Sequence, residues 1–188
     1  SSTVCDIDGN CYETIQIGEQ LWMAENLKVT HYRDGSEIQY VQSESSEPDV
    51  WENLSTGAYG YYEDDPSNLN TYGNLYNWYT VDDSRGLCMD GWHVPSDDEC
   101  TILTDYLGGA SVAGGKMKET GLGHWNSPNT GATNESGFTA LPAGYRNTGN
   151  GYYSYMGSSG YFWSSSEGNS TNAWSRKLNY DYSNVYRN

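Results

Sequence analysis

The amino-acid sequence predicts an α+β fold in which small twisted antiparallel sheets, one or two helices and long structured loops form one domain. Three observations predict it. Short runs of alternating polar and apolar residues are separated by turn-forming residues, only one long stretch has both a helix start and a helix stop, and Gly, Asn and Ser dominate much of the second half. The length of 188 residues fits a single domain spanning residues 1–188.

The first predicted element is a hairpin. The turn-forming stretch Asp6–Asn10 lies between Cys5 and Cys11 and can fold the two cysteines opposite each other. Alternation continues beyond it until Gly18–Gln20, which separates this run from a second short strand at Leu21–Met23. We expect a hairpin or small meander.

The middle of the chain carries weaker signals. The segment from Ser43 to Leu54 is polar and acidic, which indicates an exposed loop. The stretch Asp64–Asn68 contains an Asp-Pro step and is expected to form a turn. The apolar spacing in Asn74–Val81 predicts a short helix.

The clearest helix start lies at Ser96. Its side chain can accept a hydrogen bond from the amide at the third helical position, where Glu99 can reach back to the amide of Ser96. Asp97 and Asp98 favour the positive end of the helix dipole, and Gly108–Gly109 supplies the stop. This is the one long helix that the sequence predicts.

The second half is expected to combine a loop with short strands. Gly121–Asn134 is too polar to form a core, but the anchors Trp125 and Phe138 indicate a long structured loop held against the domain. Further along, Gly160–Ser165 and Ala173–Tyr180 are predicted to form short alternating strands.

The charge excludes whole classes of partner. With 25 acidic and 9 basic side chains the chain has a net charge of -16, which opposes binding to nucleic acids and to anionic membranes. No apolar run approaches the roughly 20 residues needed to cross a bilayer, so no membrane insertion is expected. Ser1–Thr3 has no signal-peptide character, which indicates a mature or trimmed product.

The four cysteines fall into two close pairs, Cys5 with Cys11 and Cys88 with Cys100. Structural zinc sites favour shorter spacings with histidine support, and the three histidines are scattered. We therefore predict two local disulfides and no metal site. Disulfides indicate an oxidising compartment, so the expected location is extracellular or at the cell surface.

The 18 Tyr and 7 Trp divide into two sets. Trp22, Trp78, Trp92, Trp125 and Phe138 are expected to build the core. A second set lies among Asn, Ser and Gly near the C-terminus, a composition that antibody binding loops also use, and it predicts a recognition surface. Its members are Tyr152, Tyr153, Tyr155, Trp174, Arg176, Tyr180, Tyr182, Asn184 and Tyr186. The alternative is that these residues alternate in exposed strands or line a subunit contact.

Several segments resemble the bacterial Fibrobacter succinogenes major paralogous domain family. The matching segments are Ile17–Leu27, Tyr72–Trp78, Cys88–Asp97, Gly131–Arg146 and Phe162–Glu167. The resemblance implies a C-type-lectin-like fold related to formylglycine-generating-enzyme-like domains. It also implies secreted or surface-displayed proteins with binding or structural roles. Some C-type-lectin-type domains are diversified by retroelements at Asn, Ser and Tyr positions, and the C-terminal segment has that composition.

The chain departs from the family pattern at two places. Cys100 stands where the family usually has Trp, which supports a bridge to Cys88, and the partner that this cysteine usually has near the C-terminus is absent. The family typically continues past the equivalent of Asn188 into a closing strand. We therefore keep the hypothesis that a strand from another molecule completes the sheet.

Two alternatives concern cations and catalysis. The Asp6–Asn10 stretch resembles the opening of a calcium loop but lacks the later Glu, so a hairpin turn is the preferred interpretation and calcium the alternative. A second candidate cation site combines Asn129, Asn134 and Glu135. Glu63–Asp65 is a candidate catalytic carboxylate run, although such runs usually form solvated turns. Formylglycine-generating chemistry needs a cysteine pair in the C-terminal half, which this chain lacks.

The expected function is therefore a non-enzymatic extracellular or cell-surface binding or adhesion module of a bacterium, without a cofactor. Its expected partner is a protein or a carbohydrate. The alternative function is a structural subunit of a surface fibre or envelope assembly, which implies a homo-oligomer.

Overall fold

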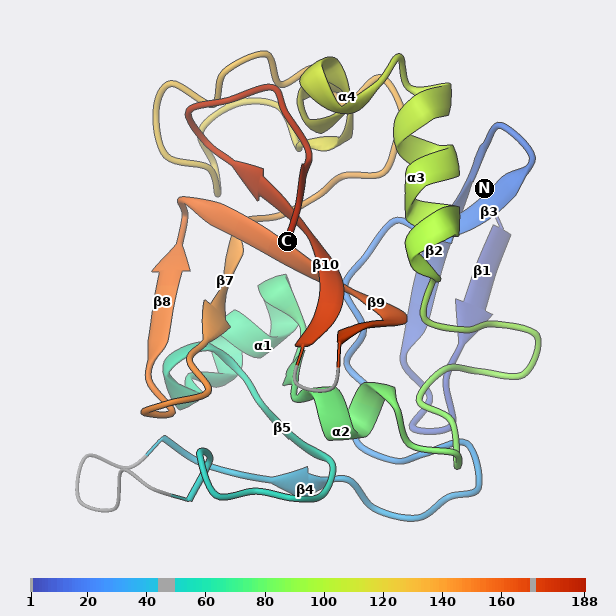
Figure 1. The fold of residues 1–188 in the computed structure, drawn as a ribbon, viewed down its shortest axis with the longest axis vertical. Coiled ribbons are helices and arrows are strands. Elements are labelled where there is room, and N and C mark those ends of the chain that lie inside the picture. Colours follow the sequence, from blue (N-terminus) through green and yellow to red (C-terminus); the bar gives the residue numbers. More distant parts are fainter. Residues whose placement is uncertain (1, 44–49, 170–171) are drawn as a thin grey trace.

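The computed structural model describes residues 2–43, 50–169 and 172–188 of the chain. It is an α+β structure, as the sequence predicts, with small sheets and short helices joined by long loops (Figure 1). The predicted loop from Ser43 to Leu54 lies partly outside the described residues.

The N-terminal sheet is an antiparallel meander, which confirms the predicted hairpin. Its strands, in spatial order, are β1 (Ser2–Cys5), β2 (Cys11–Ile17) and β3 (Gln20–Met23). Cys5 and Cys11 form a disulfide across the β1–β2 turn. The buried carboxylate of Asp6 accepts hydrogen bonds from the backbone N–H groups of Asp8 and Asn10, at 3.0 and 2.9 Å. The turn is therefore stabilised by its own aspartate.

A second small sheet and three short helices follow. The strands are β4 (Gln39–Tyr40), β5 (Ala58–Gly60) and β6 (Leu75–Tyr76), with β4 parallel and β6 antiparallel to β5. The helices are the 3-10 helix η1 (Tyr62–Asp64), α1 (Pro66–Tyr72) and α2 (Trp78–Val81).

Two predictions in this region are only partly right. Asp64–Asn68 is not only a turn, because Asp65 caps α1 by accepting a hydrogen bond from the amide of Ser67 at 2.8 Å. The helix predicted over Asn74–Val81 begins only at Trp78, because the preceding residues pair with β5 and Asn77 acts as the helix cap.

The predicted long helix is α3 (Asp97–Tyr106), with the reciprocal Ser96–Glu99 capping box. After Gly108 and Gly109, both with positive φ, a further helix α4 (Ala110–Met117) follows, which the sequence analysis missed. Because glycine is a poor helix former, the glycines of α4 weaken the helix signal in the sequence, but they permit close packing. A Cβ atom on Gly114 would lie 2.3 Å from the carbonyl oxygen of Asn184.

The largest sheet has five strands in the order β11-β10-β9-β7-β8. They are β7 (Ala143–Arg146), β8 (Tyr153–Met156), β9 (Ser159–Asn169), β10 (Asn172–Asn179) and β11 (Tyr186–Arg187). Only the β7–β9 pair is parallel. The two predicted strands correspond to β9 and β10.

The main core joins the two ends of the chain through α3. One buried cluster contains Ile17 of β2, Leu103 of α3, Leu107 directly after α3, Leu178 of β10 and Trp125. In Figure 1, α3 accordingly lies between the N-terminal sheet and the five-stranded sheet. Trp125 is fully buried and donates its indole N–H to the carbonyl of Ala140 at 3.0 Å, which confirms that it anchors its loop.

A buried lysine ties the loop at Thr130, the end of β10 and the loop that follows β10 to this core. The ammonium group of Lys118 donates to the carbonyl oxygens of Thr130, Asn179 and Tyr182 at 2.9, 3.0 and 2.9 Å. Burial lowers the pKa of Lys118 to about 8. The three acceptors account for all three N–H donors of the charged form.

Candidate functional site

The candidate site is a cavity of about 1550 Å³ between the N-terminal half and the five-stranded sheet. Its walls include the chain after β3, the region of β6 and α2, and strands β7, β9 and β10. Pockets for single small molecules usually have about 300–1000 Å³. The cavity is therefore large enough for an extended ligand.

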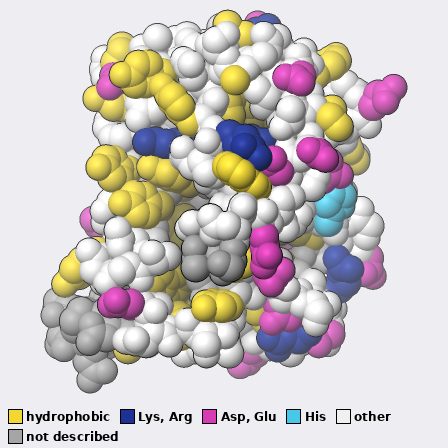
Figure 2. Space-filling model, in the orientation of Figure 1, with side chains coloured by type: hydrophobic (Ala, Val, Ile, Leu, Met, Phe, Trp, Pro, Cys, Tyr) yellow, Lys and Arg dark blue, Asp and Glu magenta, His cyan; other side chains and the backbone are white. Residues whose placement is uncertain are grey.

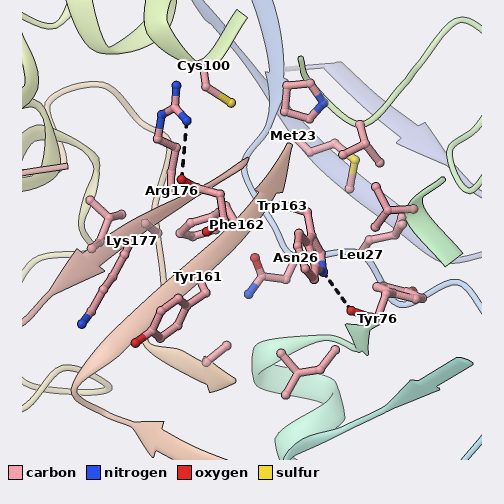
Figure 3. A pocket seen from close by; sticks show the side chains of 18 of the residues that line it. Met23, Asn26, Leu27, Tyr76, Cys100, Tyr161, Phe162, Trp163, Arg176 and Lys177 are labelled. Carbon is pink, nitrogen blue, oxygen red and sulfur yellow. Dashed lines mark hydrogen bonds between the residues drawn. The ribbon is translucent and has the colours of Figure 1, made fainter. Parts of the chain in front are cut away.

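Strand alternation decides which side chains of β9 face the cavity. Phe162 packs against the main core cluster, so its neighbours Tyr161 and Trp163 point to the opposite face of the sheet. Lys177 of β10 pairs with Tyr161 and shares that face. Figure 3 shows these residues along β9 and β10, with Met23 and Asn26 among the other labelled lining residues.

The two walls meet at an aromatic contact. The rings of Trp78 and Trp163 lie 5.7 Å apart between centroids, and the indole N–H of Trp163 donates to the carbonyl of Tyr76 at 2.8 Å, drawn as a dashed line in Figure 3. This hydrogen bond fixes the Trp163 ring while leaving the residue only partly buried.

A second aromatic group lies on the sheet. The Tyr145 ring stacks on Tyr155 at 5.7 Å with an interplanar angle of 18°, and Tyr161 contacts it edge-on at 5.2 Å. All three residues line the cavity. We call Tyr145, Tyr155 and Tyr161 the tyrosine platform. Figure 2 shows hydrophobic side chains gathered over this part of the five-stranded sheet, beside a hollow.

Tyr155 reaches the platform through an unusual backbone conformation. Its φ is +66°, in the left-handed region that costs a non-glycine residue about 1–2 kcal/mol. Tyr145 pairs with Ser154, so an ordinary strand would send the side chain of Tyr155 to the other face. The left-handed backbone instead places the Tyr155 ring on Tyr145 and leaves it 57% exposed. Strain of this kind tends to occur at functional sites.

The structure divides the predicted recognition residues. Tyr155, Trp174 and Arg176 line the cavity. Arg176 is buried and donates to Asp97 at 2.7 Å, so its role is structural. The guanidinium of Arg187 lies 3.3 Å from the ring centroid of Trp174.

The other predicted residues lie elsewhere. Tyr153 is directed inward, where burial raises its pKa and its hydroxyl donates to Asp64 at 3.2 Å. Tyr182 and Tyr186 form a separate exposed edge-on pair at 6.1 Å. The residues outside the cavity lining are Tyr152, Tyr153, Tyr180, Tyr182, Asn184 and Tyr186. The predicted residues thus do not form a single C-terminal surface. Some line the cavity, the Tyr182–Tyr186 pair lies on a separate surface, and Tyr153 points inward.

The assignment of the Trp set to the core is only partly right, since Trp125 belongs to the main core cluster and Trp22 and Phe138 pack against it. Trp22, Trp78, Trp92 and Phe138 are only partly buried and line the cavity, whereas Trp125 alone of that set is fully buried. Sequence spacing could not distinguish a core position from a cavity wall, because both remove an aromatic side chain from bulk water.

The predicted Cys88–Cys100 disulfide is not formed, and both cysteines are buried free thiols. Cys88 lies in a loop, and its backbone carbonyl accepts a hydrogen bond from Arg33 at 2.9 Å. The side chain of Cys100 points from α3 into the protein. Each thiol is packed separately, so closeness in sequence did not produce a bridge. Burial raises the pKa of both thiols to about 11.

The candidate carboxylate runs have structural partners. Asp64 accepts hydrogen bonds from the hydroxyl of Tyr40 at 3.1 Å and from the amide of Ser43 at 2.8 Å. Asp65 caps α1. These contacts account for two members of the Glu63–Asp65 run without a catalytic role.

The candidate cation ligands have protein partners as well. Asn134 binds Thr139 through both ends of its amide, Glu135 pairs with Lys116 at 2.9 Å, and Asn129 donates to the carbonyls of Glu119 and Gly121. Within the described ranges, no group of three or more His, Cys, Asp or Glu residues is arranged to hold a metal ion. In the same ranges, no helix has the length and apolarity needed to cross a membrane.

Fold and site together define an α+β domain with an aromatic-lined cavity between two structural halves. The model of the Fibrobacter succinogenes major domain matches residues 15–188, and the chain belongs to that family. Searches of curated protein sequences and of solved structures found no match.

Proposed function

We propose that this domain is a non-enzymatic binding or adhesion module that holds an extended ligand in the aromatic-lined cavity. The observation that carries the proposal is the tyrosine platform, where Tyr155 adopts a strained backbone and exposes its ring instead of burying it. Aromatic rings offer a large rigid contact area with few rotors to freeze on binding. Sugars and protein segments both suit such a surface.

A non-catalytic role is supported by the carboxylates of the cavity wall. Glu99 accepts the N–H of Ser96 at 2.7 Å within the helix cap and contacts His93. Glu119 lies 2.7 Å from a ring nitrogen of His124. A general acid or base must be able to reach the substrate's proton, and these groups are held by neighbours instead.

A C-type-lectin-like fold and an extracellular or cell-surface location belong to the same proposal. The Cys5–Cys11 disulfide supports an oxidising compartment, since such bonds persist mainly outside the cytosol. The order of helix, long loop and sheet in the second half supports the fold part of this proposal.

The test is binding to a panel of probes, namely cellulose derivatives, xylan and polygalacturonate in affinity gels, and a displayed peptide library. Tyr155→Ala and Tyr161→Ala should each weaken the binding of any positive probe by about tenfold, because each removes one stacking ring. Tyr182→Ala is the matched control, because Tyr182 is 52% exposed and lies outside the cavity lining. A loss with Tyr182→Ala and none with Tyr155→Ala would place recognition on the C-terminal surface instead.

A structural subunit of a surface assembly is the second candidate function. The exposed pair Tyr182 and Tyr186, which lies outside the cavity lining, offers a surface for contact with a second subunit. Concentration-dependent filaments in electron micrographs would favour this candidate. A single monomeric species in light scattering would argue against it.

A further inference from the structure

The cationic side chains of the protein differ in whether a carboxylate or a backbone carbonyl binds them. Seven of the nine bind carboxylates or backbone carbonyls of the described residues: Arg33, Arg85, Lys116, Lys118, Arg146, Arg176 and Arg187. The other two, Lys28 and Lys177, form no side-chain hydrogen bond or ion pair with any described residue, and both line the cavity. In a chain of net charge -16, two ammonium groups without an anionic partner at one cavity indicate an anionic ligand.

Lys177 is held beside the tyrosine platform. It pairs with Tyr161 across β9 and β10, and its ammonium nitrogen lies 5.4 Å from the centroid of the Tyr161 ring. Figure 3 shows the two side chains next to each other. A cation–π contact of this kind orients the ammonium group without neutralising it. Its N–H groups stay available to an acceptor on a ligand that stacks on the platform.

The nearby carboxylates do not cancel this charge. Of the acidic residues in the cavity wall, Glu25 accepts the amide of Glu13 at 2.8 Å, Glu99 closes the helix cap, and Glu119 faces His124. Glu19 is exposed at the turn after β2. None of these carboxylates forms an ion pair with Lys177, so the ammonium group beside the platform has no direct anionic partner among the described residues.

The site also favours a sugar over a peptide. Extended peptides that bind to a sheet add a strand to its edge, where main-chain groups are free. Strand β9 lies between β10 and β7, so it offers the ligand side chains and not a free edge. Tyrosine faces suit the C–H faces of sugar rings, and amides such as Asn26 suit their hydroxyl groups.

We propose that the cavity binds an acidic oligosaccharide, in which a uronate carboxylate binds Lys177 while the sugar rings stack on the tyrosine platform. This inference rests on the proposed binding function and specifies the ligand class. Polygalacturonate is the probe with the required chemistry. Its methyl ester is the neutral counterpart of the same chain, and dextran sulfate and polyglutamate carry the anion on a different group or polymer.

The experiment measures binding of the full chain to these four polymers by calorimetry at two salt concentrations. Polygalacturonate should bind and lose affinity as salt is raised. Lys177→Met, which keeps the apolar stem, should weaken that binding by about tenfold or more, because it removes a charge-assisted hydrogen bond. It should leave binding of the methyl ester unchanged, and Lys177→Arg should retain most of the affinity for the acid. Lys116→Met is the matched control, because Lys116 pairs with Glu135 outside the cavity.

Each contrary outcome has a distinct meaning. Equal binding of the acid and its methyl ester, or an unchanged affinity of Lys177→Met, would overturn the carboxylate contact. If Tyr155→Ala still weakened binding in that case, the proposed binding function would stand. Binding of dextran sulfate alone would replace the carboxylate by a sulfate ester, and preference for polyglutamate would indicate an acidic protein partner. If Lys177→Met failed to fold, Lys177→Gln would replace it in the same comparison.

Discussion

At the scale of single residues, two side chains depart from ordinary behaviour, and each departure has a purpose in the structure. Lys118 is completely buried, although lysine is among the residues least often found inside proteins. Tyr155 keeps its ring exposed on a strained backbone. The first residue supports the loops and the second forms part of the candidate site. Tyr155 is among the recognition residues that the sequence predicts, whereas Lys118 was not singled out, because its charge alone predicts exposure to solvent.

Replacing Lys118 by Met should destabilise the protein by about 3 kcal/mol, since three buried carbonyl groups lose a charged donor. Urea unfolding measures the change. Lys116→Met lies two residues away, removes only a partly exposed ion pair, and should cost less than about 1 kcal/mol. Similar losses in both variants would show that the three hydrogen bonds contribute little.

The strain at Tyr155 can be tested by comparing two truncations. Tyr155→Gly should be more stable than Tyr155→Ala by about 1 kcal/mol, because glycine alone adopts a φ of +66° without steric cost. Thermal unfolding of the two variants decides the point. Both should lose ligand binding equally, since both lack the ring. A more stable alanine variant would contradict the left-handed backbone.

At the scale of elements, the start of α3 holds the edge of the five-stranded sheet. The carboxylate of Asp97 binds Arg176 of β10 at 2.7 Å and Arg187 of β11 at 2.8 Å. The hydrogen bonds from Arg187, and then those from Arg176, keep the pKa of Asp97 below its usual 3.8. The Asp97 side chain thus lies at the positive end of the helix dipole and also binds two strands.

Because the folded-state pKa of Asp97 is lowered, its stabilisation is present above about pH 4 and is lost as the pH falls through the folded value. Asp97→Asn should lower the free energy of unfolding by about 3 kcal/mol at neutral pH, since it leaves the buried Arg176 without its anion. The gap to wild type should shrink below pH 4, as measured by denaturant unfolding across pH. The exposed neighbour variant Asp98→Asn should change stability by less than about 0.5 kcal/mol. A gap that stays constant down to pH 2 would contradict the ion-pair account.

Elements with a local cause were predictable, and elements with a tertiary cause were not. The capping box at Ser96 and the hairpin at Asp6 depend on contacts between residues that are close in sequence, and both predictions were confirmed. Helix α4 was missed because its glycines are explained only by the chain that packs against them. The Trp lining of the cavity was missed for a related reason, since only the assembled halves show which aromatic side chains remain partly open.

At the scale of the whole molecule, the two halves meet around the cavity and are joined without a second disulfide. The Cys5–Cys11 bridge lies within the N-terminal hairpin, while Cys88 and Cys100 are buried thiols. The connection between the halves rests on packing around α3 and on aromatic contacts such as Trp78 with Trp163. Covalent constraint is therefore local.

Thiol counting tests this arrangement directly. Native protein should resist an alkylating reagent at neutral pH, because both thiols are buried and their pKa values of about 11 leave little thiolate. In denaturant without reductant, mass spectrometry should find two alkylated cysteines, falling to one in Cys88→Ser. Two further thiols should appear only after reduction. Absence of alkylation in denaturant would restore the Cys88–Cys100 bridge that the sequence predicts.

The hydrogen bonds of Lys118 have a consequence for which substitutions the domain can tolerate. It holds Thr130, Asn179 and Tyr182 by their main-chain oxygens and makes no demand on their side chains. Mutations can therefore exchange the side chains of these loops without releasing the loops from the scaffold. An anchor that binds main-chain oxygens thus holds the backbone in place while it leaves the identity of these side chains open to substitution.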